Sequence, residues 1–267
     1  MSTLSTGARL VPIICFLALF GAGCRGTGSR PVVDPDTTSS TAVTGPEGVA
    51  CRHEYYPIVP SYRALYQTSI NGVSTGSYIL SVAWVRDNQA YLAARFASPG
   101  DSVVVNSNQQ FRCSRGALEA IGYIDTGALQ PGGASYNNAR VQTNSTSGSF
   151  FPERVVAGTE WESAVNITMT YPERTDAFEV TAPIRPVTID VVTHKKAIGL
   201  ETIDLPIGRR EAMRIEVSVS FGGLSTFSKT EWWVKDIGMV KSLSYSSLRE
   251  EDPPTLTQME DYVVPGI

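Results

Sequence analysis

The chain has 267 residues, of which 42% are hydrophobic, 18% are charged and 9% are aromatic. These values fit one ordinary globular domain with an additional segment, and they exclude a collagen, a chain disordered throughout and a polytopic membrane protein. The formal net charge of -4 argues against nucleic acid as a partner.

Residues 1–23 have the layout of a secretory signal peptide. A single positive charge, Arg9, precedes the apolar run 10–20, and the small residues Gly21, Ala22 and Gly23 follow it. The run is about eleven residues long, whereas a transmembrane helix needs roughly 20, so a permanent membrane span is the weaker interpretation. We therefore expect this segment to direct export.

The residues before Cys24 resemble the lipobox of bacterial lipoproteins. In that family, signal peptidase cuts before the cysteine and its sulfur receives a diacylglycerol, in an anchor whose acyl chains include palmitate. Gly21 departs from the pattern, because lipoproteins usually have Leu, Val or Ile at that position. The resemblance implies lipidation of Cys24, with ordinary secretion of an unmodified cysteine as the alternative. Arg25 follows the anchor instead of an acidic residue, which favours the outer membrane if the host has two membranes.

Residues 24–50 are predicted to form a lipidated cysteine and a disordered tether. The stretch 25–50 has no aromatic residue, and 17 of its 26 positions are Gly, Ser, Thr, Pro or Asp. Such a segment cannot bury enough apolar surface to fold. We expect it to hold a folded domain off a membrane surface.

The cysteine count favours one disulfide. Cys15 leaves with the signal peptide and Cys24 takes the lipid, so Cys51 and Cys113 are the pair left in the folded part. An exported compartment permits a disulfide. A two-thiol metal site would need further ligands, and neither His53 nor His194 sits in a metal-binding spacing with them, so no metal is expected.

From Cys51 onward the strongest signal is alternation with a period of two, which is typical of strands with one buried face. In the stretch 211–221, Met213, Ile215 and Val217 point one way while Arg214 and Glu216 point the other. The stretches 165–171 and 78–85 repeat this pattern, the second less cleanly. The fold class is therefore predicted to be all-β.

Turn chemistry separates these strands. Asn71-Gly72, Asp87-Asn88 and Gly222-Gly223 are predicted hairpin connections. They give two meanders of long antiparallel strands, 62–97 and 211–245, which could be halves of one sheet. Helix signals are almost absent. The stretch 126–148 is predicted to be a long loop, the all-β domain to span 51–248, and 249–267 to be a polar, proline-broken tail.

Short motifs in the domain resemble a broad group of uncharacterised bacterial envelope proteins. They are Tyr55-Tyr56-Pro57-Ile58, Phe151-Pro152, Gly158-Thr159-Glu160-Trp161, the run 201–208 and the run 232–241, which holds Trp232, Trp233, Gly238 and Lys241. The fold of that group is similar to the lipoprotein carriers and receptors of the LolA and LolB type. The resemblance implies a highly curved antiparallel sheet, an incomplete barrel, with an apolar concave face.

No motif indicates catalysis or a cofactor. The run 72–76 matches G-x-S-x-G, but that motif needs a strand before it and a helix after it, and here it lies in a turn that leads into a strand. His53 and His194 are interpreted as solvated surface residues. The carboxylate pairs lie in the tether and the tail, where nothing would position them for acid-base chemistry. An enzyme is therefore not expected.

Two functional hypotheses remain. In the first, the concave face of a lipid-anchored envelope protein binds a lipid or another hydrophobic ligand. Trp84, Trp161, Phe221 and Trp232 would line that face, although the same residues would equally fill a closed core. In the second, the lipoprotein scaffolds an envelope assembly through a protein partner and takes no small ligand.

Overall fold

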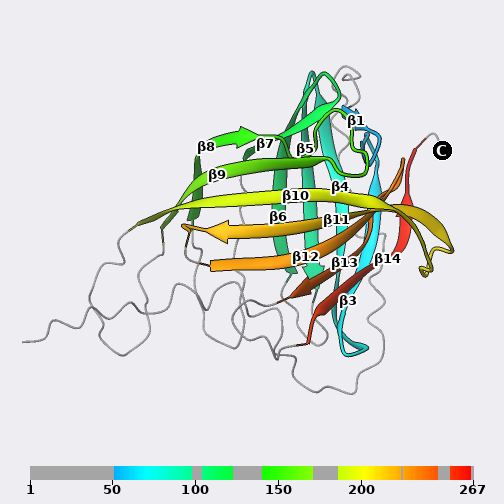
Figure 1. Ribbon diagram of the computed structural model, residues 1–267. Coiled ribbons are helices and arrows are strands. Elements are labelled where there is room, and N and C mark those ends of the chain that lie inside the picture. The colour runs from blue at the N-terminus through cyan, green and yellow to red at the C-terminus, as the bar shows by residue number, and fades with distance from the viewer. Residues whose placement is uncertain are drawn as a thin grey trace, which may run out of the picture.

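The computed structural model describes residues 51–97, 104–122, 140–170, 186–223, 225–245 and 253–265. The predicted signal peptide, Cys24 and the predicted tether lie outside these residues. Every regular element in the described part of the chain is a strand (Figure 1). None of the described residues belongs to a helix long and apolar enough to cross a membrane.

The strands follow the alternating segments of the sequence closely. They are β1 (Cys51–His53), β2 (Tyr56–Ile58), β3 (Arg63–Ile70), β4 (Val73–Arg86), β5 (Gln89–Ala97), β6 (Val104–Ser114), β7 (Ala117–Gly122), β8 (Arg140–Gly148), β9 (Glu160–Thr170), β10 (Val187–Ile203), β11 (Arg210–Phe221), β12 (Ser225–Val234), β13 (Gly238–Tyr245) and β14 (Thr255–Val263).

Twelve of these strands form one antiparallel sheet in the order β7-β6-β5-β4-β3-β14-β13-β12-β11-β10-β9-β8. The two edge strands, β7 and β8, meet at one end. There Leu118 N–H donates to Phe151 O at 2.9 Å, and Phe150 N–H donates to Leu118 O at 2.7 Å. The sheet is therefore curled nearly into a barrel. Figure 1 shows the result, with β9 to β12 crossing in front of β4 to β6 at a steep angle.

The end where β7 meets Phe150 and Phe151 is here called the closed end. The short hairpin β1-β2 packs into it, and Tyr56 contacts Phe111 and Trp233 with ring centroids 5.8 and 5.4 Å apart. A disulfide joins Cys51 in β1 to Cys113 in β6, which is the pair that the cysteine count favours. These aromatic side chains are large and packed in edge-on contacts, so they fill the closed end.

The predicted hairpins are confirmed. Asn71 and Gly72 have φ values of 51° and 75° in the β3-β4 turn, and Asp87 has a φ of 50° in the β4-β5 turn. Gly222 and Gly223 connect β11 to β12, also with positive φ. Asparagine, aspartate and glycine tolerate this left-handed conformation best, which is why these dipeptides mark the turns. The two predicted meanders lie in the same sheet.

Two segments that the sequence predicted to lack strands form strands. Residues 140–148, expected as part of a loop, form β8, which pairs with β9. Residues 255–263, expected as a polar tail, form β14, which lies in the middle of the sheet between β3 and β13. Polar Thr and Gln side chains hide the alternation of β14, and a register shift between Met259 and Asp261 breaks its period of two. β8 is masked in the same way by Ser, Thr and Asn side chains and by a shift between Thr143 and Ser145.

Candidate functional site

The four aromatic residues predicted to line one apolar face do not share it. Trp161 lies on the inner face of the sheet, where its indole N–H donates to Phe150 O at 3.0 Å and its ring lies 5.9 Å from that of Phe151. Phe221 ends β11 opposite Val191, and its side chain lies outside the described part of the structure.

Trp84 and Trp232 lie on the outer face, which corrects the expectation for both. A register shift between Val82 and Trp84 turns Trp84 outward, where it stacks on Tyr91 with ring centroids 5.7 Å apart. A β-bulge of this kind inserts one residue and reverses the faces of those that follow. Trp232 points to the outer face because its neighbour Trp233 points inward, yet it is only 9% exposed there, and its indole N–H donates a hydrogen bond to Glu201.

The inner face changes character along the barrel. At the closed end its side chains are buried, as Ile215, Leu92 and Ala64 illustrate at 0% exposure. Toward the opposite end, here called the open end, many inner-face residues become partly exposed, and several of them are apolar. The partly exposed apolar residues are Ile70, Tyr78, Val165, Val187 and Ile189. The open end of the inner face therefore offers apolar surface that the described residues do not cover.

Three charged side chains lie among the apolar residues of this inner face: Lys195, Lys229 and Glu231. They are here called the inner charge cluster. Lys195 and Glu231 are only 5% and 3% exposed, and the Lys229 side chain is 28% exposed. Lys195 Nζ lies 3.8 Å from the centroid of the Phe150 ring and donates to Phe150 O at 3.4 Å. Its ammonium group is therefore held by an aromatic face and a backbone carbonyl.

Glu231 links the cluster to the aromatic core. Its carboxylate forms an ion pair with Lys229 and accepts a hydrogen bond from the Trp233 indole N–H at 2.9 Å. Burial alone would raise the pKa of Glu231, but the charges of Lys229 and Lys195 and these hydrogen bonds outweigh it and lower the pKa to about 2. Burial also lowers the pKa of Lys195 to about 8, against the opposing effect of the Glu231 charge. At neutral pH the cluster thus carries one net positive charge.

Hydroxyl side chains extend from the inner charge cluster across the inner face. Ser244 lies opposite Lys229 in the sheet register, and Thr255 lies opposite Ser244. In the neighbouring row, Ser242 lies opposite Glu231, followed by Thr257. Cross-strand partners project from the same face of a sheet, so these hydroxyls face inward with the cluster. Ser244 and Thr255 are partly exposed.

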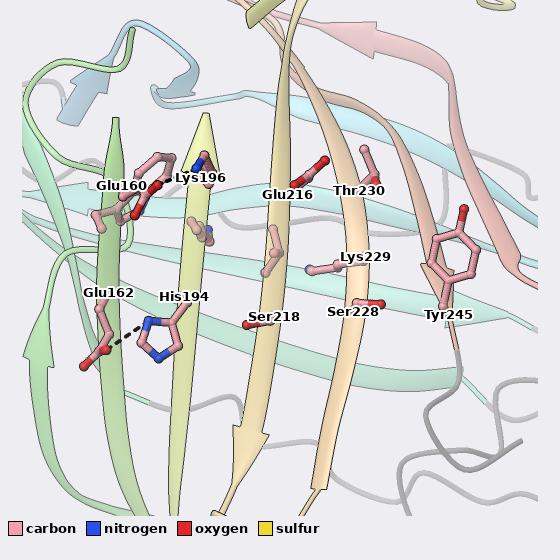
Figure 2. Close-up of a pocket in the computed structure, with 13 residues that line it drawn as sticks. Glu160, Glu162, His194, Lys196, Glu216, Ser218, Ser228, Lys229, Thr230 and Tyr245 are labelled. Atoms are coloured by element: carbon pink, nitrogen blue, oxygen red, sulfur yellow. Dashed lines mark ion pairs between the residues drawn. The ribbon is translucent and has the colours of Figure 1, made fainter. Parts of the chain in front are cut away.

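The outer face of β9 to β13 carries a shallow hollow of about 600 Å³ (Figure 2). Figure 2 shows two cross-strand ion pairs in it, Glu160 with Lys196 at 2.6 Å and Glu162 with His194 at 3.1 Å. All four side chains are at least half exposed. Exposed pairs of this kind contribute little to stability and are screened by salt. The described residues bring no three metal-binding side chains together.

His53 corrects another expectation, because it is buried and not solvated. Its Nδ1 accepts a hydrogen bond from Tyr55 N–H at 3.1 Å, so its Nε2 carries the proton that it donates to Pro152 O at 2.9 Å. The ring stacks on Phe151 at 4.9 Å, and burial lowers its pKa. His53 is therefore a neutral structural residue of the closed end. His194 is exposed, as expected.

The inner charge cluster was not predicted from the sequence. A usable signal was present, because Lys195 lies in phase with Val191 and Ala197, and Glu231 lies in phase with Trp233. A charge in phase with the apolar positions of a strand points into the core. Nothing in the sequence shows that Lys195 and Glu231, 36 positions apart, belong to one cluster.

Comparison with known proteins shows the fold. No family model matches the chain, and no curated protein matches its sequence. A Bacteroides fragilis protein described as exported and as having a YmcC-like fold aligns with 80% of this chain and 100% of its own, at 12% identity and a TM-score of 0.52. A Parabacteroides distasonis protein described as a lipoprotein aligns with 79% of this chain and 99% of its own, at 13% identity and a TM-score of 0.50. The predicted all-β, curved, incompletely closed sheet is thus confirmed as a known fold.

Proposed function

We propose that the chain is an exported lipoprotein, anchored to the cell envelope through Cys24, whose β domain binds a lipid or another hydrophobic ligand without catalysing a reaction. The partly exposed apolar surface at the open end of the inner face is the observation that carries this proposal. Ligand sites are concave and mostly apolar, with a small number of polar groups that fix orientation. The inner face has both components.

The anchor is supported by two independent features. The signal layout and small residues before Cys24 resemble a lipobox, and the two structural neighbours are described as an exported protein and as a lipoprotein. Arg25 after the anchor supports the outer membrane as the destination in a host with two membranes. The proposal assigns no chemical step to the protein, because the ion pairs of the outer hollow are exposed cross-strand pairs.

A scaffolding role is the second candidate, and a specific surface favours it. Trp84 stacks on Tyr91 on the outer face, and the Arg86 guanidinium lies 5.7 Å from the Trp84 ring centroid. Tryptophan, tyrosine and arginine are enriched at the centres of protein interfaces. A protein partner in the envelope would contact this surface, and the inner face would then need no ligand.

Native mass spectrometry tests the first candidate against the second. The chain from Arg25 to Ile267 is exported without the lipid-bearing cysteine, purified without detergent, and examined for bound mass that denaturation releases. Ile189→Gln places a polar group on the inner face of β10. Thr188→Gln is the matched control, because Thr188 is exposed on the outer face one position earlier.

The ligand proposal predicts a lipid-sized adduct on the wild-type chain and on Thr188→Gln, and its loss from Ile189→Gln. Circular dichroism and thermal unfolding of both variants confirm that the domain is folded. A wild-type chain free of any adduct, or an adduct that both variants keep equally, would contradict binding on the inner face. A wild-type chain free of any adduct would favour the scaffolding role.

A further inference from the structure

The inner charge cluster is placed where the apolar inner face turns from filled to partly exposed. Lys229 lies opposite Val217 on β11, and the apolar residues Val219 and Ile189 continue from there toward the open end. The cluster holds two ammonium groups and one carboxylate. The carboxylate is already engaged by Lys229 and by the Trp233 indole. One positive charge is therefore left without an anionic partner within the cluster.

Donors suited to an anion lie beside Lys229, at the more exposed side of this net positive cluster. Lys229 has three N–H donors and is the most exposed member of the cluster. Ser244 and Thr255, both partly exposed, extend from it across β13 and β14. Hydrogen bonds from a charged donor to a carboxylate or phosphate are about twice as strong as those between neutral groups. An ammonium beside two hydroxyls is thus a suitable cradle for anionic oxygens.

Burying charged side chains among aromatic rings costs free energy, so the presence of these charges needs an explanation. Replacing a buried ion cluster by apolar side chains of similar volume is often neutral or stabilising, so packing alone does not explain why charges are present here. The adjoining partly exposed surface includes apolar side chains, which suit a hydrocarbon chain chemically, and the cluster lies at the inner end of that surface.

We propose that the inner face binds an anionic amphiphile, with its carboxylate or phosphate headgroup at Lys229, Ser244 and Thr255 and its hydrocarbon chain along the apolar residues toward the open end. This inference rests on the proposed ligand-binding function and names the chemical class of the ligand. A carboxylate and a phosphate monoester share the recognition chemistry. A fatty acid and a phospholipid are the two corresponding sources.

Titration calorimetry with four probes tests the headgroup. Dodecanoate, dodecyl phosphate and dodecanol share one chain, and inorganic phosphate is the headgroup alone; each is added below its aggregation concentration to the chain from Arg25 to Ile267. The proposal predicts that the better anionic probe binds at least about tenfold more tightly than dodecanol, which is about 1.4 kcal/mol. Inorganic phosphate is predicted to bind far more weakly than dodecyl phosphate.

Three variants locate the effect. Lys229→Gln is expected to reduce the preference over dodecanol to less than about threefold, and Ser244→Ala, which alters no charge, is expected to weaken the anionic probes alone. Lys196→Gln, on the outer face of β10, is the control and is expected to keep the full preference. If Lys229→Gln leaves Glu231 unpaired and the domain unfolds, Ser244→Ala still decides the matter.

The possible results distinguish failure of the headgroup site from failure of the proposed ligand-binding function. Equal binding of dodecanol and the anionic probes by a folded wild-type chain overturns the headgroup site and leaves hydrophobic binding intact. Failure of every dodecyl probe to bind overturns both. An equal loss in Lys196→Gln assigns the preference to overall surface charge and contradicts the site. Whether dodecanoate or dodecyl phosphate binds more tightly distinguishes a fatty acid from a phospholipid.

Discussion

Lys195 places an ammonium group in the core, against the rings of Phe150 and Phe151 and near the Glu231 carboxylate, and its burial has a measurable consequence. Its pKa is about 8 in the folded chain, against 10.5 for an unperturbed lysine, mainly because of burial. Between pH 8 and about 9.5 the unfolded chain binds more protons than the folded chain. The free energy of unfolding should therefore rise with pH in this window, by about 1 to 2 kcal/mol.

Lys195→Met is predicted to remove that rise, because methionine does not titrate. Urea unfolding at several pH values measures both chains, and the difference between them excludes groups that they share. Above about pH 10 the trend should reverse, since burial raises the pKa of Tyr56 and Tyr66 and unfolding then releases their protons. Parallel stability curves for the two chains between pH 8 and 9.5 would refute the assignment.

Two features favour glycine at position 148: a positive φ and close packing against a neighbouring backbone. Its φ is +73°, and a Cβ added there would lie 2.1 Å from Glu162 O. Gly72 has a similar φ of +75° with nothing within 4 Å, so it is a matched control. Gly72→Ala should cost about 1 kcal/mol through strain alone, and Gly148→Ala at least about 1 kcal/mol more, measured by urea unfolding. Equal costs would show that the backbone at the end of β8 shifts to accept the methyl group.

At the scale of the element, the disulfide holds the hairpin β1-β2 against the sheet. Cys51 and Cys113 are 62 positions apart, and closing a loop of that length stabilises a domain by about 4 kcal/mol on the chain-entropy model. Replacing both cysteines by alanine should lower the free energy of unfolding by about this amount. Hydrogen exchange should lose protection first in β1, β2 and the Phe150-Phe151 segment. Uniform loss across all strands would mean that the closed end does not open separately.

The strands themselves were predictable where alternation is uninterrupted and turns carry Asn-Gly, Asp-Asn or Gly-Gly. β11 is such a case, with Met213, Ile215 and Val217 buried as expected. The sequence could not show the register shifts, because the residue that a bulge inserts is set by cross-strand pairing and carries no pattern of its own. The shift in β4 moved Trp84 to the outer face, and the one in β14 hid a central strand. The inner charge cluster could not be predicted for the same reason, because it depends on which residues of different strands face inward together.

At the scale of the whole molecule, the position of β1 determines which end of the domain is joined to the N-terminal segment. β1 starts at the closed end, so the predicted tether would join the domain there, with the open end opposite. As a flexible chain, the 26 residues from Arg25 to Ala50 span about 28 Å on average and about 85 Å at full stretch. A flexible segment of that length would let the domain turn, so the proposed anchored protein could direct its open end toward or away from its own membrane.

The anchor makes a direct prediction for the whole chain. Cys24→Ser should give unprocessed or soluble protein, because serine cannot accept the diacylglycerol through sulfur. Membrane fractionation and intact mass of the wild-type and variant chains measure this. Cys15→Ser is the control and should be processed normally, since that cysteine lies within the signal peptide. Normal processing and unchanged fractionation of Cys24→Ser would contradict lipidation.

Binding on the inner face is the central claim, and photo-crosslinking in intact cells tests it most directly. A benzoylphenylalanine residue is introduced at position 189 on the inner face of β10, or at position 188 on its outer face, in the full chain with its anchor. Mass spectrometry of the purified, proteolysed protein then identifies what each position captured. If the proposed binding is correct, a lipid-type molecule is captured on the peptide that contains position 189 and none on the peptide modified at position 188. Equal capture at both positions, or no capture of a hydrophobic molecule at position 189, would contradict the claim.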